Sequence, residues 1–334
     1  MSEPVPPLAS LFAALSALPE VPFAPYRDRL YSFDELTEGI EAGYDATLDA
    51  RIAAYYADAP HGEADQLAQA THDASISTAL DRLLTADGSA VVGVMGGHGI
   101  ARTDPRYAEI AQLGRLLTRA GYLVATGGGP GVMEAANLGA WLAPHPDRAL
   151  GDALTLLADV PTPDDHFEDY LILGLAARAR WSDGGASLGV PTWVYAHEPT
   201  SPFSRHIAKY FANSVRENGL LAIATAGIVF APGGPGTEQE IFTDAAQNSY
   251  TAYNVRSPIV FFDRGYYADA GAALVAGVRH QADLAAWPEL VSEVDTATAA
   301  LAAIAGAGTL APRPRRPANA PRRLRPTELE GPPA

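Results

Sequence analysis

Three apolar segments of this chain end in glycine-rich loops, and each loop is followed by the apolar periodicity of an amphipathic helix. The segments are 89–97 (SAVVGVMGG), 122–129 (YLVATGGG) and 226–234 (AGIVFAPGG). Short apolar runs of this kind are typical of buried parallel strands. Strands that alternate with helices predict a Rossmann-like α/β fold, in which helices cover both faces of a mainly parallel sheet. We expect a sheet of five or six strands.

The composition limits the classes of protein to which the chain can belong. Its 334 residues are 48% apolar, which is enough to bury a full core, and none of them is cysteine. The lack of cysteine excludes disulfides, thiolate metal sites and a cysteine nucleophile. No segment approaches the roughly 20 apolar residues of a membrane span, and the N-terminus lacks the positive region of a signal peptide. We therefore expect a cytoplasmic protein that does not bind a membrane.

The acidic charge of the chain argues against a nucleic-acid partner. The formal net charge is −16, and the C-terminal segment 308–334 holds six arginines against two acids, so residues 1–307 carry a net charge of −20. A body this acidic repels a phosphate backbone at long range. We interpret the C-terminal segment as a solvated Pro/Arg-rich tail.

The order of these patterns predicts three parts. Residues 1–86 are alanine-rich with a helical pattern, and we interpret them as a helical N-terminal extension or cap. Residues 87–307 make up the Rossmann-like domain, with an insertion near 145–190. Within this domain the sequence predicts a strand at 190–197 (VPTWVYAH) and a helix at 204–219 (SRHIAKYFANSVRENG).

Two of the glycine loops have the form of anion sites. The stretches 126–140 (TGGGPGVMEAANLGA) and 231–242 (APGGPGTEQEIF) both have the pattern of strand, glycine loop and helix. Glycines let the backbone approach a ligand closely, and the following helix N-terminus presents free N–H groups and the positive end of its dipole. Because parallel strands end at the same edge of a sheet, we expect the loops at 127–131 and 233–237 to lie side by side.

Other nucleotide-binding motifs do not fit the chain. A P-loop requires Gly-Lys-Ser/Thr, and the only lysine is Lys209, within the predicted helix at 204–219. A dinucleotide-binding fold places an acidic residue after its second strand, where this chain has Thr126 followed by glycines. A pyridoxal enzyme needs a lysine for its Schiff base, and Lys209 is the sole candidate. We expect neither a cofactor nor a metal ion.

The second loop carries the signature PGGxGTxxE, and together with the GGG loop it resembles the LONELY GUY (LOG) family, whose members are often labelled lysine decarboxylases. The resemblance covers residues 89–282. It implies a Rossmann-like fold, a homodimer or larger oligomer, and hydrolysis of the N-glycosidic bond of a nucleoside 5′-monophosphate to a free base and ribose 5-phosphate. The signature residues are Pro232, Gly233, Gly234, Gly236, Thr237 and Glu240, and those of the companion loop are Gly127, Gly128, Gly129 and Gly131.

The resemblance also implies roles for individual residues. Glu240 faces the positive charge that develops on the sugar, or delivers the attacking water, as carboxylates do in glycosidases. The family pairs this glutamate with an arginine, for which Arg216 has the expected spacing, and Arg178 and Arg180 are the alternatives. The expected phosphate and ribose contacts are Gly128, Gly129, Gly131, Gly233, Gly234, Gly236 and Thr237.

Several assignments stay open from the sequence alone. The structural alternative for Glu240 is a favourable interaction with the dipole of its own helix, and that for Arg216 is a solvated cation near the end of another helix. Asp244, one turn beyond Glu240, is a candidate for a ribose hydroxyl or an exposed acid. The candidates for contacts to the base or sugar are Gly97, His98 and Glu134.

Two functions from different classes fit these observations. The first is a nucleoside-monophosphate hydrolase with a nucleotide substrate, and the presence of both Glu240 and Arg216 favours it. The second is a non-catalytic nucleotide-binding or sensor protein that uses the same loops. Besides these two, a third interpretation is a structural or carrier protein that uses the same loops for another anion, such as a phosphorylated cofactor.

Overall fold

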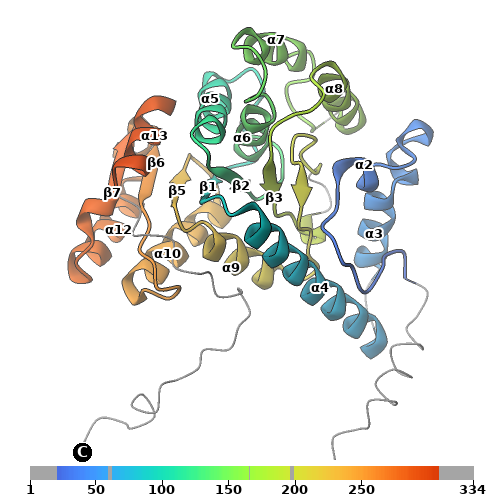
Figure 1. Cartoon of the computed structure of the whole chain (residues 1–334), viewed down its shortest axis with the longest axis horizontal. Helices are drawn as coiled ribbons and strands as arrows, with labels where there is room; N and C mark the ends of the chain where they lie inside the picture. The colour runs from blue at the N-terminus through green and yellow to red at the C-terminus, as the bar shows by residue number, and fades with distance from the viewer. Residues whose placement is uncertain (1–20, 59–61, 165, 196–198, 308–334) are drawn as a thin grey trace, which may run out of the picture.

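The computed structural model describes residues 21–58, 62–164, 166–195 and 199–307, and its centre is a seven-stranded sheet in which every pairing is parallel (Figure 1). The order across the sheet is β4-β3-β2-β1-β5-β6-β7. The predicted Rossmann-like α/β class is confirmed, with more strands than expected. The strands are β1 (Val91–Met95), β2 (Leu123–Thr126), β3 (Ser187–Gly189), β4 (His206–Ile207), β5 (Gly227–Phe230), β6 (Ile259–Phe262) and β7 (Val291–Val294).

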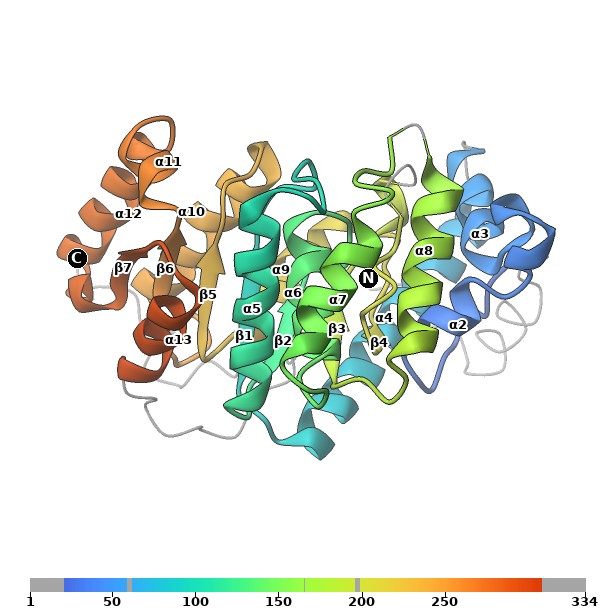
Figure 2. The ribbon, with the colours of Figure 1, turned by 90° about the horizontal axis from the view of Figure 1, so that it is seen from above.

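Helices cover both faces of the sheet (Figure 2), and their apolar side chains form two buried clusters, one on each face. One layer consists of α5 (Pro105–Arg119), α6 (Val132–Trp141), α7 (Arg148–Leu157), α8 (Phe167–Arg180) and α13 (Ala297–Gly306). The opposite layer consists of α4 (Glu63–Asp87), α9 (Asn213–Ile223), α10 (Pro235–Tyr250), α11 (Arg264–Ala268) and α12 (Ala272–Leu284). Short 3-10 helices are η1 (Ile40–Ala42), η2 (Tyr44–Ala46), η3 (Trp193–Tyr195) and η4 (Pro288–Leu290).

Strand β1 is the point at which the order of the strands reverses. Strands β2, β3 and β4 follow on one side of it, and β5, β6 and β7 follow on the other. Val92 of β1 is in register with Val124 of β2 and with Gly227 of β5. The carboxyl ends of these three strands therefore meet at one edge of the sheet, where ligands of open α/β folds bind.

The described part of the predicted helical N-terminal extension, residues 21–58 and 62–86, contains helices and packs into the common core. Residues 1–20 and 59–61 of that prediction lie outside the described residues. The described part contains α2 (Phe33–Leu36), α3 (Leu48–Ala57) and α4, and its apolar side chains share a buried cluster with the sheet. Tyr31 forms an antiparallel bridge to Ile207, with N–H···O distances of 3.0 Å in both directions. This bridge pairs backbone groups that the edge strand β4 would otherwise leave open.

The strand predicted at 190–197 is wrong. The strand in this part of the chain is β3, which ends at Gly189, and the backbone then turns into η3 at Trp193. Pro191 has no N–H to donate to a ladder, which disfavours a continued strand.

The helix predicted at 204–219 is only partly correct, because α9 begins at Asn213. His206 and Ile207 pair with β3, and Ile207 also pairs with Tyr31. The carboxylate of Asp73 on α4 then accepts the N–H groups of Phe211 and Ala212, at 3.0 and 2.8 Å. These partners are distant in sequence, so the local periodicity does not contain them.

The region near 145–190 that the sequence set apart consists of α7, α8 and β3. Its stretch 170–180 (YLILGLAARAR) belongs to α8. In the described ranges no helix is both long enough and apolar enough to cross a bilayer. The tail predicted at 308–334 lies outside the described residues.

Candidate functional site

Three loops meet where β1, β2 and β5 end. The N–H of Gly97, after β1, donates to the carbonyl of Pro232, after β5, at 3.0 Å. The carbonyl of Gly97 in turn accepts from the N–H of Val132, at the start of α6, at 3.2 Å. Both glycine loops therefore lie at the same edge of the sheet, as the sequence predicted, but the loop after β1 lies between them, so they are not directly side by side.

The loop after β5 is the more open of the two. Helix α10 begins at Pro235, its N-cap is Gly234, and no side chain caps it. Gly234 and Gly236 are exposed, whereas Thr237 is buried. A Cβ on Gly233 would collide with Oγ1 of Thr237 and would lie 2.8 Å from the nitrogen of Gly97, so the close approach of these loops requires glycine there. Uncapped N–H groups at the positive end of a helix are a suitable site for an anion.

The loop after β2 is buried. Gly128, Gly129 and Gly131 lie beneath the loop after β1 and the segment near Ser201, whose N–H donates to the carbonyl of Gly128 at 2.8 Å. Gly131 has φ +67°, and a Cβ there would lie 2.5 Å from the carbonyl oxygen of His98. The loop after β2 is therefore the buried part of the candidate site, and the loop after β5 is its open part.

Arg216 and Glu240 come together between these loops. Nη1 of Arg216, on α9, lies 3.3 Å from Oε1 of Glu240, on α10, and Nε of Arg216 donates to the carbonyl of Val190 at 2.8 Å. The two side chains belong to residues that are only 9% and 8% exposed. A Cβ on Gly127 would collide with Nη2 of Arg216, so the guanidinium lies directly against the first glycine loop.

The surroundings of Glu240 act on its carboxyl in opposite directions. Burial raises the pKa of Glu240 above its ordinary value, Arg216 lowers it, and the nearby carboxylate of Glu217 raises it. Desolvation is the largest of these effects, and it disfavours the ionised form. A buried carboxyl beside an arginine and near the uncapped N-terminus of α10 is a candidate for acid–base chemistry.

The two alternative arginines have other partners. Arg178 donates to the carbonyl of Pro202 and pairs with Asp34 at 3.2 Å. Arg180 lies over the ring of Trp181. Of the three arginines considered, Arg216 is therefore the one that contacts Glu240.

The residues proposed for base or sugar contacts have different surroundings. Gly97 lies between the two glycine loops, and His98 is exposed on the same loop after β1. Glu134 is fully buried and accepts two hydrogen bonds from Arg102, at 2.8 and 3.1 Å, and one from Tyr107 at 2.6 Å. Because these bonds occupy both of its oxygens, the site proposed below does not include Glu134.

Asp244 is buried, with an exposed fraction of 3%, although exposure was the default expectation for it. Among the residues that the structure describes, none forms a hydrogen bond with its Oδ2. Burial alone raises the pKa of Asp244 to about 8, so this carboxyl is mostly protonated at neutral pH.

Lys209 does not lie in a helix, as the sequence predicted, but follows β4 in the core. Its Nζ donates to Asp49 at 2.7 Å and to Thr200 at 2.9 Å. A Schiff base requires a free, neutral amine, so this ion pair argues against pyridoxal chemistry at the chain's single lysine. Within the ranges that the structure covers, no three His, Asp or Glu side chains gather where they could hold a metal ion.

Sequence reasoning missed one pair at the site. Oε2 of Glu217 accepts from Nε2 of Gln239 at 2.6 Å, and Oε1 accepts from Nδ2 of Asn213 at 2.8 Å. Glu217 follows Arg216 and Gln239 precedes Glu240. The signal in the sequence was the acid Glu217, which directly follows Arg216.

Comparisons with known proteins were made against families, curated proteins and solved structures. Residues 173–304 match the family model described as "Possible lysine decarboxylase", and residues 89–143 match that of the "SLOG cluster4 family". The search of curated proteins found no match.

Two of the similar solved structures are those of proteins that bind or carry the molybdenum cofactor. The molybdenum cofactor binding protein of Rippkaea orientalis is 17% identical, with a TM-score of 0.41, over 66% of this chain and 97% of that chain. The molybdenum cofactor carrier protein of Chlamydomonas reinhardtii is 18% identical, with a TM-score of 0.39, over 65% and 97%. The family matches include the signature residues at this site, and the chain is thus a relative of the lysine decarboxylase-like (LOG) proteins.

Proposed function

We propose that this protein hydrolyses the N-glycosidic bond of a nucleoside 5′-monophosphate and releases a free base and ribose 5-phosphate. The observation that carries the proposal is the buried pair of Arg216 and Glu240 beside the uncapped N-terminus of α10. A helix N-terminus that suits an anion and a buried carboxyl thus lie within the first two turns of the same helix.

The phosphate is assigned to the loop after β5. The backbone from Gly233 to Thr237 offers N–H groups and the positive end of α10, which favour a doubly charged anion. Arg216 adds the one positive side chain identified at this point of the site. Because the body of the chain is acidic, such local groups must supply the attraction for a phosphate.

Glu240 is assigned to the reacting bond. When the C1′–N bond breaks, the sugar develops positive charge, which the ionised carboxylate stabilises. A water molecule adds its oxygen to C1′ and gives up a proton, and the departing nitrogen takes up a proton. A carboxylate placed at C1′ serves as the base for that water, and its interaction with Arg216 favours the ionised form.

A non-catalytic nucleotide-binding or sensor protein is the second candidate. It is favoured by the fact that Arg216 and Glu240 are already paired with each other without a ligand. A sensor needs the anion site but not a reactive carboxyl.

An assay of purified protein with a panel of nucleoside 5′-monophosphates tests the proposal. Chromatography should detect a free base and ribose 5-phosphate in equal amounts from at least one nucleotide, and no reaction with the matching nucleoside, which lacks the phosphate. Binding of a nucleotide by calorimetry without release of base would favour the sensor. Because nucleoside monophosphates are metabolites of the cytoplasm, the proposed location is the cytoplasm.

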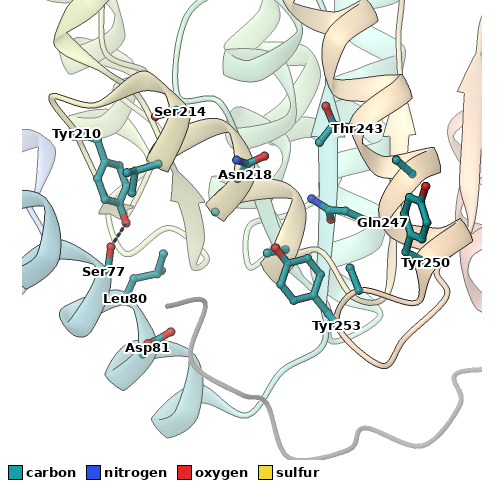
Figure 3. A pocket seen from close by; sticks show the side chains of 15 residues that line it. Ser77, Leu80, Asp81, Tyr210, Ser214, Asn218, Thr243, Gln247, Tyr250 and Tyr253 are labelled. Carbon is teal, nitrogen blue, oxygen red and sulfur yellow. Dashed lines mark hydrogen bonds between the residues drawn. The ribbon is translucent and has the colours of Figure 1, made fainter. Parts of the chain in front are cut away.

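We further propose that the protein forms a homo-oligomer through a hollow of about 550 Å³ between α4, α9 and α10 (Figure 3). Tyr250 is 85% exposed at this hollow, and Val215 and Tyr253 are partly exposed there. Val275 and Val278 of the apolar helix α12 belong to the buried cluster that packs against the sheet, so these side chains do not offer an interface. Light scattering should give a dimer or larger species for the wild type and a smaller one for Tyr250→Glu, and a monomeric wild type would contradict this.

A further inference from the structure

Two side-chain bridges run between α9 and α10, one beside the other. The first joins Arg216 to Glu240 at 3.3 Å, and the second joins Glu217 to Gln239 at 2.6 Å. In each helix the two partners are consecutive residues. The second bridge is the shorter, and it lies on the more exposed side, since Gln239 is exposed and Glu240 is buried.

Glu217 is held firmly for a carboxylate near the surface. Asn213, one turn earlier on α9, donates to its other oxygen at 2.8 Å, so both oxygens have an amide partner. Charge-assisted hydrogen bonds of this kind are stronger than neutral ones. The negative charge is therefore fixed in position close to the buried pair.

This placement has an electrostatic consequence for Glu240. Arg216 favours the ionised form of the Glu240 carboxyl, whereas the fixed charge of Glu217 and burial both favour the protonated form. On α10 the neighbouring ionisable side chains are Glu238, which is exposed in the first turn, and Asp244, one turn beyond Glu240. His98 is exposed on the loop after β1.

We propose that Glu217 and Gln239 are positioning residues, which hold α9 against α10 so that Glu240 remains within reach of Arg216, while the Glu217 charge opposes that of Arg216. Neither side chain needs to touch the substrate for this role. The inference rests on the proposed hydrolysis for its kinetic consequence, but its geometric part concerns the protein alone.

Two variants separate the bridge from the charge. Gln239→Ala removes the donor on α10 and keeps the charge of Glu217, whereas Glu217→Gln keeps a side chain that can accept from Gln239 and removes the charge. Glu238→Gln is the matched control, because it removes an exposed acid next to Gln239 and has no part in either bridge. Thermal melting of each variant verifies that it is folded.

The readouts include two that need no substrate. Carbon-13 NMR of glutamate-labelled protein, with Glu240→Gln to assign the signal, should show Glu240 titrating at lower pH in Glu217→Gln and unchanged in Glu238→Gln. A crystal structure of Gln239→Ala should show Glu240 more than about 4 Å from Arg216, beyond ion-pair distance. With a nucleotide substrate, kcat of Gln239→Ala should fall roughly tenfold or more while KM changes little, because a small misplacement affects the reacting geometry.

Two results would overturn the inference. One is an unshifted Glu240 titration in Glu217→Gln, and the other is an intact Arg216–Glu240 contact in the crystal structure of Gln239→Ala. If the wild type hydrolyses no nucleotide, the proposed function fails, but the titration and the crystal structure still decide whether these residues position the pair.

Discussion

Arg216 and Glu240 stand 24 residues apart in the sequence, and in the fold Nη1 of the arginine lies 3.3 Å from Oε1 of the glutamate. Helix α9 supplies the first residue and α10 the second, and the strand between them, β5, ends at the open glycine loop. The pair therefore joins the two segments on either side of β5 at the edge where a ligand would bind. This relationship is the basis of the first two predictions.

Glu240→Gln should separate catalysis from binding. The amide keeps the shape of the side chain and loses its charge, so hydrolysis should fall by roughly 10²–10³, which is typical for the loss of one electrostatic stabiliser. Nucleotide binding should persist or tighten, because a negative charge near the phosphate is gone. Steady-state kinetics and calorimetry measure the two effects. Weaker binding with an undiminished rate would show that Glu240 only stabilises its helix.

Arg216→Ala should destabilise the fold as well as the site. It leaves the buried carboxyl of Glu240 without its cation, and breaking a pair that is mostly buried costs about 3–5 kcal/mol. The double variant Arg216→Ala/Glu240→Gln should recover part of this loss, since the unpaired charge is removed too. Urea unfolding of the wild type, both single variants and the double variant measures the coupling. Strictly additive effects would mean that the two residues do not interact.

Local sequence patterns predicted the strands and loops of this site because the residues that form each of them are consecutive in the sequence. The glycines, the apolar run before them and the helix after them are all within one short segment, so the loops after β2 and β5 could be placed correctly. Strand β4 has only two residues, and it forms because β3 and Tyr31 are there to pair with it. The pattern of apolar residues around positions 206 and 207 does not show that these pairing partners exist.

Side-chain partners were predicted less well than backbone elements. Lys209 was placed on an amphipathic helix, but its position is fixed by Asp49, which comes 160 residues earlier. Asp244 was expected to be exposed, because a carboxylate usually is, and its burial depends on the packing around α10. The choice between Arg216 and its two alternatives also needed the fold. Contacts of this kind depend on how the helices pack and cannot be inferred from spacing along the chain.

Gly131→Ala should be strongly destabilising. Gly131 has φ +67°, which is unfavourable for alanine, and the added Cβ would lie 2.5 Å from the carbonyl oxygen of His98. The clash would also displace the loop after β1, so nucleotide binding should weaken. The control is Gly151→Ala on α7, where a Cβ meets nothing within 4 Å and should stabilise the helix by about 1 kcal/mol. Melting temperatures that fall or rise together for the two variants would contradict this account.

Asp244→Asn should stabilise the protein, and the gain should grow with pH. In the folded protein the pKa of Asp244 is raised to about 8 by burial, whereas in the unfolded chain it is about 4. Between these values the folded state holds a proton that the unfolded state has released. The stability of the wild type due to this group is therefore fully present below pH 4 and is lost as the pH rises to about 8, by at most about 1.4 kcal/mol per pH unit.

Asparagine does not titrate, so residue 244 of the variant does not lower the free energy of unfolding as the pH rises. Urea unfolding at several values between pH 5 and pH 9 should give a difference in unfolding free energy that shifts in favour of Asp244→Asn up to about pH 8 and then levels off. Asp152→Asn, an exposed acid on α7, is the control and should show a difference that is nearly constant with pH. Other titrating groups, including Glu240, are common to both proteins and cancel in the comparison. A difference that stays constant across this range for Asp244→Asn would mean that its carboxyl is ionised in the folded protein, with a partner or solvent that stabilises the charge.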